Sequence, residues 1–391
     1  MATEIRRSRG SLIQRGDDPR KWTLILDLGR GPSGKRRRQW KSFTGSRRAA
    51  EARLNELLAD VDAGVYIKPT KATLGAFFER WLSDYAAARV RATTLEGYRW
   101  RSKRLLAGLG DIRLIDLRPE HIQRYYTSML TTGELAGGTL VKHHNLLRHA
   151  LATAVRWQLV PNNVAEHVDP PRRSRKEMRA LTAAEVHRLL DSCHTTAWYA
   201  IFHTLIWTGL RRSELLGLRW QDVDLLMANL RVTQVLHQLG DGRYVWEEPK
   251  TTKGKRGVAL SPASCLVLRA QRERQERDAA FLGISLSDDR LVFSHLVDGA
   301  PLRPDTVTQA FRRLVKRIGL AGVRLHDLLH THASLLLQQG IHPKVVSERL
   351  GHSSIQITPD TYSHLLPGLQ EAAANGFDAV MEPEPVHTTL G

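Results

Sequence analysis

The sequence predicts an α+β protein that is mainly helical and divided into three domains. Short alternating segments within residues 10–43 predict a three-stranded sheet. Apolar residues recur at helical spacing through residues 74–157, and the remainder is mostly helical with a β-segment near 229–260. A length of 391 residues suits two or three domains. We expect domains at 1–65, 72–170 and 177–391.

Composition and charge limit the class of protein. The chain has 58 Lys and Arg against 40 Asp and Glu, a net charge of +18. This balance favours a polyanionic partner, most often nucleic acid, although a merely basic enzyme or ribosomal-type surface is the alternative. Only Cys193 and Cys265 are present, which excludes a disulfide scaffold or a Cys-rich zinc module. No apolar stretch reaches about 18 residues, and the N-terminus, Met1 to Gly10, is Arg-rich without an apolar core. We therefore expect no membrane span, no signal peptide and a cytoplasmic location.

The N-terminal region reads as three short strands followed by a helix over 47–63. Its third strand is rich in cations, with Arg36, Arg37, Arg38 and Lys41. The two-residue period places Arg36 and Arg38 on one face with Trp40, and Arg37 and Lys41 on the other. Such a strand cannot be fully buried. We interpret one face of the sheet as a candidate for the DNA major groove, with a charge-protected edge strand as the alternative.

Four helical segments follow, and basic residues interleave with their apolar stripes. They begin near Leu74, Thr93, Pro119 and Thr139. The candidate DNA contacts in and after this region are Arg99, Arg101, Lys103, Arg172 and Arg173. Arg172 and Arg173 lie in a Pro-containing basic linker suited to following a phosphate backbone. Ordinary solvated helix faces are the alternative for any one of these residues.

Three sequence blocks occur in order in the last region. They are Trp207-Thr208-Gly209-Leu210-Arg211-Arg212-Ser213-Glu214, His326-Asp327-Leu328-Leu329-His330, and Leu350-Gly351-His352 with Asp360-Thr361-Tyr362. Together they resemble the tyrosine recombinases, the phage-integrase family, and the resemblance covers essentially the whole chain. It implies an arm-type DNA-binding domain over 1–65, a helical core-binding domain over 72–170 and a catalytic domain with a C-terminal tail over 177–391.

The resemblance also implies roles for site residues. Arg211 would clamp the scissile phosphate, Tyr362 would attack it, and Lys250 would protonate the leaving oxygen. His326 and His352 would donate hydrogen bonds to the phosphate. Metal-free cleavage needs such fixed donors, because negative charge grows on the phosphate in the transition state.

Several alternatives to these roles stay open. Lys253 and Lys255 rival Lys250 in a segment, 248–260, that resembles the family's β-hairpin. Arg212 competes with Arg211 by register, and Glu214 is a candidate to orient Arg211 across one helical turn. Three further histidines are expected to be structural, namely His330, His332 and His364. Neither a metal nor a cofactor is expected.

One position departs from the family pattern. The second block normally reads His-x-x-Arg, and here Leu329 stands where the second phosphate-clamping Arg belongs. A leucine can neither donate a hydrogen bond nor carry charge. Arg324 lies two residues before His326 and is not expected to substitute. We therefore expect an impaired enzyme.

The resemblance implies a site-specific recombinase that integrates or excises a phage or mobile element through a 3′-phosphotyrosyl intermediate. It would act as a homotetramer on double-stranded DNA, at core and arm sites, near the nucleoid of a bacterial host. It also allows for a directionality factor or a host DNA-bending protein as partners. The alternative is a catalytically inactive DNA-binding or architectural protein of the same fold, and a type IB topoisomerase is a third reading.

Overall fold

The structure is a computed structural model. It describes residues 10–16, 18–30, 34–62, 71–172, 179–295 and 297–352, together with Phe377 and Met381. The chain divides into two compact units, Met1–Arg175 and Lys176–Gly391. Both mix helices with small antiparallel sheets, as expected for a mainly helical α+β protein. No helix in the described ranges is long and apolar enough to cross a membrane.

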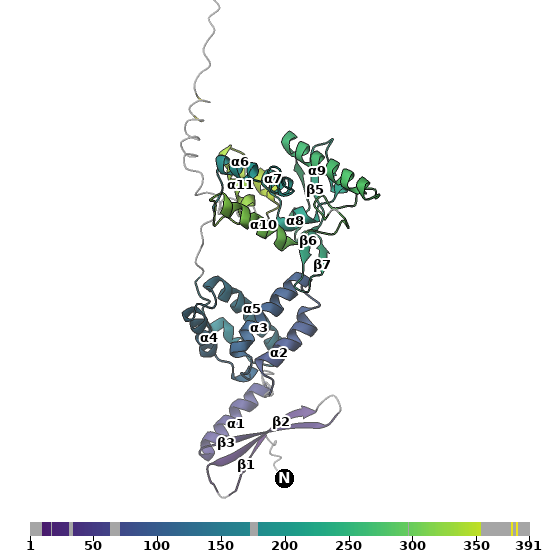
Figure 1. Ribbon diagram of the computed structural model, residues 1–391. Helices are drawn as coiled ribbons and strands as arrows, with labels where there is room; N and C mark the ends of the chain where they lie inside the picture. Colours follow the sequence, from purple (N-terminus) through teal and green to yellow (C-terminus); the bar gives the residue numbers. More distant parts are fainter. Residues whose placement is uncertain are drawn as a thin grey trace, which may run out of the picture. The chain divides into compact units, whose positions relative to one another are not determined.

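The first unit begins with an antiparallel sheet in the order β1-β2-β3, covered on one face by a helix (Figure 1). These elements are β1 (Gly10–Gln14), β2 (Lys21–Arg30), β3 (Arg36–Thr44) and α1 (Arg47–Asp62). Leu24 and Leu26 of β2 pack against Leu54 and Leu57 of α1. The alternating apolar residues of β2 therefore face the helix, as the two-residue period predicted.

The register of β3 fixes which of its cations share the helix-covered face. Lys41 pairs with Leu24, whose side chain belongs to the apolar cluster under α1. Trp40 pairs with Ile25 and is 59% exposed on the opposite, open face. By alternation, Arg36 and Arg38 lie on the open face with Trp40.

The rest of this unit is a helical bundle around Trp81, which is fully buried. Its helices are α2 (Leu74–Arg80), α3 (Ala92–Leu109), α4 (Pro119–Thr131) and α5 (Gly137–Arg156), with 3-10 turns η2 (Leu114–Asp116) and η3 (Val164–His167). The four predicted helical segments are all present. A π-helical turn, η1 (Trp81–Ala86), was not predicted, and in it Trp81 stacks on Tyr85 and Tyr98.

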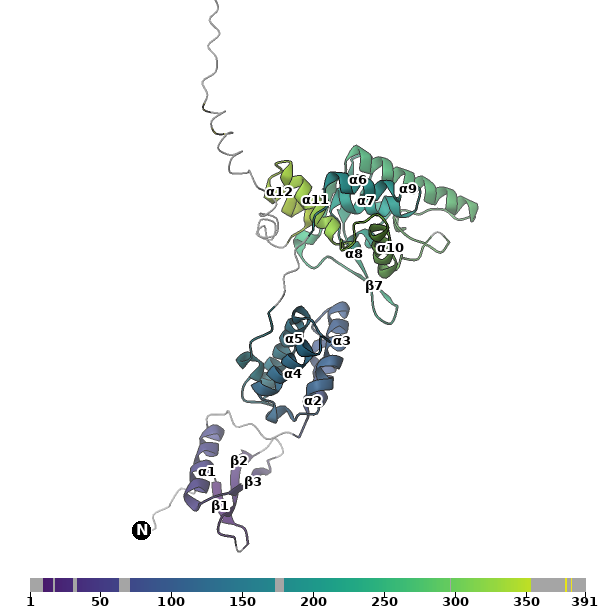
Figure 2. The ribbon, with the colours of Figure 1, turned by 60° about the vertical axis from the view of Figure 1, so that its left-hand side comes forward.

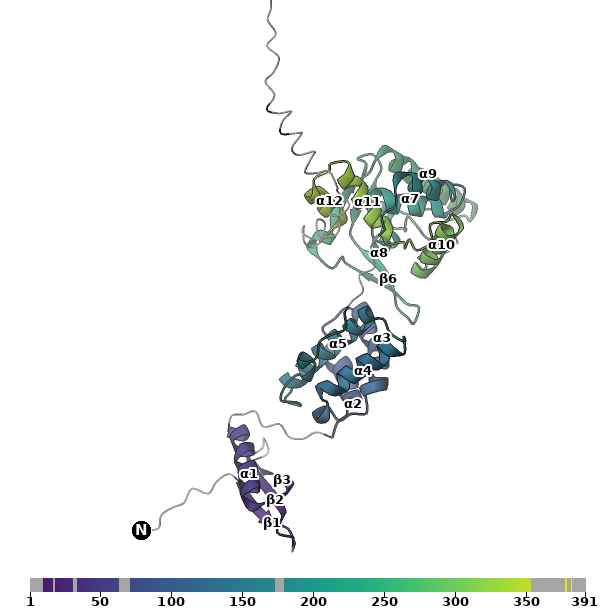
Figure 3. The same ribbon diagram turned by 90° about the vertical axis from the view of Figure 1, so that its left-hand side faces the viewer.

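The second unit has a large core and a smaller apolar cluster between two helices. Its helices are α6 (Ala183–Asp191), α7 (Trp198–Thr208), α8 (Arg212–Gly217), α9 (Pro262–Phe281), α10 (Pro304–Arg317), α11 (Asp327–Gln338) and α12 (Pro343–Leu350), with 3-10 turns η4 (Trp220–Asp222) and η5 (Thr252–Gly254). Phe202, Trp220 and Phe311 are buried in the large core. The smaller cluster joins α11 to α12, which lie side by side (Figures 2 and 3).

Two small sheets complete this unit, and they correct one expectation. The strands are β4 (Val223–Asp224), β5 (Asn229–Val232), β6 (Val235–Gln238), β7 (Tyr244–Glu247) and β8 (Arg256–Ala259). The sheets have the orders β4-β5-β8 and β6-β7. The expected hairpin over 248–260 is therefore wrong. Residues 248–255 connect β7 to β8, and these two strands belong to different sheets.

Candidate active site

The first block forms the turn that brings Arg211 to the start of α8. Helix α7 ends at Gly209, whose φ of 66° is left-handed. A Cβ at this position would lie 2.6 Å from Leu350 Cδ2 and 2.7 Å from His332 Cδ2. Glycine is thus required both by the backbone conformation and by the close approach of α11 and α12. Arg211 follows as the residue that caps α8.

Glu214 holds Arg211 in place. Its carboxylate accepts hydrogen bonds from the Arg211 backbone N–H at 2.8 Å and from Arg211 Nη1 at 2.7 Å. The Glu214 side chain is 3% exposed, whereas that of Arg211 is 34% exposed. Hydrogen bonds from Arg256 and the charges of both arginines keep the pKa of Glu214 below its ordinary value despite the opposing effect of burial. The predicted contact across one helical turn is present.

Arg212, the rival of Arg211, points to a different part of the unit. Its Nη1 donates to the Pro304 carbonyl at 3.0 Å and to Thr308 Oγ1 at 2.6 Å, both on α10. This contact ties α8 to α10. The structure is therefore consistent with Arg211, and not Arg212, as the candidate phosphate clamp.

His326 and His352 come from two helix ends near Arg211. His326 caps α11, and His352 follows the left-handed Gly351 that ends α12. Burial, and then the charge of Arg211, lower the pKa of His326. Burial, and then Arg211 and Arg256, lower the pKa of His352 to about 4. Arg211 is thus within electrostatic reach of both imidazoles, and both are neutral at pH 7.

The Lys250 connection packs beside His352. A Cβ at Gly351 would lie 3.1 Å from the Lys253 carbonyl oxygen, so the η5 turn touches the end of α12. Lys250 itself is exposed, and Lys255 forms an ion pair with Glu248 at 2.8 Å. Tyr362 and His364 lie outside the described residues.

Leu329 is buried where the family pattern has an arginine. It is 3% exposed and packs with Ala333, Leu337, Val346 and Leu350 between α11 and α12. Arg324 does not replace the missing cation, because its Nη2 is bound to Asp327 at 2.8 Å. Arg211 and Arg324 both lower the pKa of His326, and of these two it is Arg211 that also lowers the pKa of His352.

Two further observations were missed by sequence reasoning. His330 lies one turn after His326, with ring centroids 5.0 Å apart, although it was expected only to be structural. Arg256 binds Glu214 from β8, and an arginine at the head of an apolar strand was the available signal.

His332 accepts a hydrogen bond from Arg349 Nε at 3.0 Å, which fits a structural role. No cluster that could hold a metal occurs in the described part of the chain.

The candidate DNA contacts fall in several places. Arg99 and Lys103 are exposed on α3, whereas the Arg101 guanidinium lies 5.8 Å from the centre of the Tyr98 ring. Arg36, Arg37 and Arg38 are exposed, and Arg36 pairs with Asp27 at 3.0 Å. Arg172 is exposed, and Arg173 lies outside the described residues.

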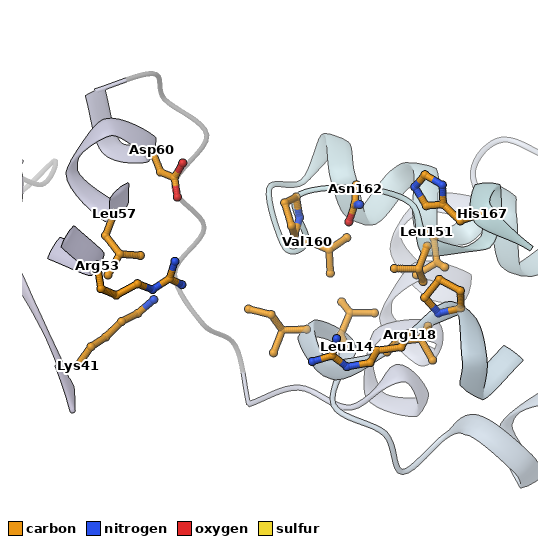
Figure 4. Close-up of a pocket in the computed structure, with 15 residues that line it drawn as sticks. Lys41, Arg53, Leu57, Asp60, Leu114, Arg118, Leu151, Val160, Asn162 and His167 are labelled. Atoms are coloured by element: carbon orange, nitrogen blue, oxygen red, sulfur yellow. The ribbon is translucent and has the colours of Figure 1, made fainter. Parts of the chain in front are cut away.

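Lys41 lines a pocket in the first unit with Arg53, Leu57 and Asp60 (Figure 4). Burial, and then the charge of Arg53, lower the pKa of Lys41. The pocket's other lining residues, among them Leu114 and Arg118, belong to the helical bundle. None of the catalytic candidates lines it, so it is separate from the candidate active site.

Comparisons with known proteins agree with the three blocks. The model of the phage integrase family matches residues 179–368, and that of the phage integrase N-terminal SAM-like domain matches 73–130. The integrase of Streptomyces ambofaciens is 29% identical over 400 residues, covering 97% of this chain and 99% of that protein.

Two solved structures share the fold. The Tn1549 transposon integrase in complex with a circular intermediate DNA has a TM-score of 0.67 at 21% identity, covering 79% of this chain and 99% of that one. A lambda integrase tetramer bound to a Holliday junction has a TM-score of 0.54 at 20% identity, covering 88% and 95%. The two family models together match more than half of the sequence. The chain therefore belongs to the phage integrase family, as its three sequence blocks predicted.

Proposed function

We propose that this chain is a site-specific DNA recombinase that integrates or excises a phage or mobile element. The observation that carries the proposal is the convergence of Arg211, His326 and His352, with Arg211 fixed by the buried Glu214. A partly exposed guanidinium within electrostatic reach of two neutral imidazoles can, together with them, donate several hydrogen bonds to one phosphate. Such fixed donors act best where negative charge develops during the reaction.

The reaction would proceed by transesterification. The Tyr362 hydroxyl releases its proton to solvent as its oxygen attacks the scissile phosphorus, a 3′-phosphotyrosyl bond forms, and the bond from phosphorus to the 5′ oxygen breaks. Lys250 gives its proton to the departing 5′ oxygen, which leaves as a hydroxyl. Arg211, His326 and His352 contact the non-bridging oxygens. The phosphodiester energy is conserved in the protein–DNA bond, so a second 5′ hydroxyl can reverse the step without ATP, metal or cofactor.

Double-stranded DNA would be bound at core and arm sites. We assign the arm site to the domain of residues 1–65 and the core site to the domains of residues 72–170 and 177–391. The open sheet face with Arg36, Arg38 and Trp40 is the proposed arm contact, because a β-ribbon fits the major groove. Arg99, Lys103 and Arg172 are the proposed core contacts. The tetramer solved for lambda integrase supports a homotetramer here. The bacterial cytoplasm is the proposed location, with a directionality factor or DNA-bending protein as further partners.

A second candidate function is favoured by Leu329 alone. With an apolar side chain in place of a phosphate-clamping arginine, the chain would bind core sites without cutting them. It would then act as an architectural or repressor-like DNA-binding protein. The other expected catalytic positions are all occupied by the expected residue types, which favours the recombinase.

The test is covalent trapping on a nicked suicide duplex. The core site is first obtained by selecting bound duplexes from a random pool. We expect the chain to form a small amount of protein–DNA adduct that survives denaturation, and Tyr362→Phe to form none. Equal adduct yields from both proteins would contradict Tyr362 as the nucleophile. Tight specific binding with no adduct, even after Leu329→Arg, would favour the architectural function.

A further inference from the structure

We infer that Arg256 is a positioning residue for the proposed cleavage reaction, joining the Arg211–Glu214 pair to the end of α12 that carries His352. This inference rests on the proposed function. Arg256 lies at the start of β8, far in sequence from both partners. Its side chain is 6% exposed, so it is an internal link between elements.

Each nitrogen of the Arg256 guanidinium has an acceptor. Nη1 and Nη2 donate to the two carboxylate oxygens of Glu214 at 3.2 and 3.0 Å. Nε donates to the Arg349 carbonyl at 2.6 Å, in the last turn of α12. Arg256 is therefore engaged with protein on both sides and does not serve as a phosphate clamp itself.

The link reaches both proposed phosphate contacts. On one side, Glu214 binds the backbone and guanidinium of Arg211. On the other, a Cβ at Gly351 would lie 2.8 Å from Arg256 Nη1, so the turn leading to His352 packs directly on the guanidinium. Moving Arg256 would therefore disturb the placement of Arg211 and His352 together.

Charge explains why an arginine is needed. Glu214 is almost completely buried, and a buried carboxylate with one partner removed is strongly destabilised. The guanidinium fork binds both carboxylate oxygens and leaves Nε for the carbonyl of α12. A lysine could neutralise Glu214 but could not make all three contacts at once. It should restore charge balance without restoring the full geometry.

The test compares Arg256→Met and Arg256→Lys with a matched control, Arg219→Met. Arg219, like Arg256, pairs with a buried carboxylate, in this case that of Asp222 at 2.9 Å. Asp222 lies three residues after Arg219, and this pair lies outside the candidate site. All variants are made in the full chain carrying Leu329→Arg. Cleavage is measured in single turnover on the suicide duplex, and DNA affinity is measured separately.

We expect Arg256→Met to slow cleavage by about 10–100-fold, because small misplacements of catalytic groups cost about this much. DNA affinity should change less than about threefold, because the phosphate backbone contacts that dominate it are elsewhere. Arg256→Lys should recover part of the rate, and Arg219→Met should cleave like its parent. A loss in Arg256→Met no larger than in Arg219→Met would overturn the inference.

A second readout needs neither cleavage nor DNA. Arg211 and Glu214 act on the pKa of His326, whereas Arg256 is not among the groups that do so directly. Titration of labelled histidine rings by NMR should therefore show a higher His326 pKa in Arg256→Met, as Arg211 moves away. An unchanged His326 titration would refute the inference. If the parent never cleaves DNA, the proposed function fails, and this titration still decides whether Arg256 holds Arg211 near His326.

Discussion

Leu329→Arg is the most informative single change in this chain, because it restores one cation at a defined place. Position 329 lies in the first turn of α11, three residues after His326, and its backbone N–H donates to the His326 carbonyl at 3.2 Å. The side chain now contributes to the contact between α11 and α12. An arginine here would have to leave that cluster and extend toward the proposed phosphate position.

The expected gain and cost follow from this environment. Restoring one donor to transition-state charge is worth about 10²–10³ in rate, or about 2.7–4 kcal/mol. Replacing a leucine that is 3% exposed by a longer, charged side chain costs about 1–3 kcal/mol of stability, although the arginine stem retains some packing. We therefore expect faster cleavage together with a lower melting temperature. Bound DNA should recover part of the lost stability, because it supplies a partner for the charge.

The assay is the rate of adduct formation on the suicide duplex at saturating protein. Leu329→Gln is the matched control, since it introduces a polar side chain of intermediate length without charge. We expect Leu329→Arg to be at least about 100-fold faster than the parent, with Leu329→Gln close to the parent. The reasoning is refuted if parent and Leu329→Arg trap the duplex equally well, or if Leu329→Gln matches the arginine.

Three further predictions follow from the same geometry. In the Leu329→Arg background, Arg211→Lys should slow cleavage by about 10²–10³. Arg212→Lys should leave the cleavage rate per folded molecule unchanged, because the Arg212 side chain binds α10. Single-turnover kinetics on the suicide duplex measures both rates, and a larger loss in Arg212→Lys than in Arg211→Lys would contradict the assignment. The pKa of His330, His332 and His352 is lowered to about 4 in the folded chain, so the stability that these neutral imidazoles contribute above about pH 6.5 should be lost as the pH falls toward 4. Urea unfolding should therefore have a lower midpoint at pH 5 than at pH 7.5. Equal midpoints would count against these buried neutral imidazoles. Arg38→Ala, on the open sheet face, should weaken binding of an arm-site duplex and reduce the salt dependence of binding by about one counterion. Arg37→Ala should have a smaller effect on both quantities. Fluorescence anisotropy across a salt series measures affinity and salt dependence, and identical effects of the two variants would show that the face assignment is wrong.

The sequence predicted the elements well because their patterns are local. The two-residue period placed Trp40 and Lys41 on opposite faces of β3, and the register agrees. Proline at the first helical position marked the start of α4. The π-helical turn at Trp81 was not predictable in this way, because it accompanies ring contacts with Tyr98 and His149 from other helices.

The contacts of the candidate site show the same division: the local contact was predicted from the sequence, and the long-range contact was not. Arg211 and Glu214 are three residues apart, so helical geometry alone predicted their contact. Arg256 binds the same carboxylate from 42 residues away, and only the fold reveals it. The expected hairpin over 248–260 failed for a related reason. A short strand can pair with either of two neighbours, and β8 pairs with β5 because this buries Val258 against Leu230 in the large core.

The charge of the proposed site explains how one residue separates binding from cleavage. Glu214 cancels one of the two guanidiniums it binds, and the neighbouring imidazoles are neutral at pH 7. Among the three proposed contacts to the non-bridging oxygens, Arg211, His326 and His352, about one positive charge therefore remains to face a phosphodiester that carries one negative charge in the ground state. The transition state concentrates more negative charge on the same oxygens, and an arginine at position 329 would meet it. Because interactions made only in the transition state raise the rate, replacing that arginine by leucine should leave DNA recognition largely intact and slow the chemical step.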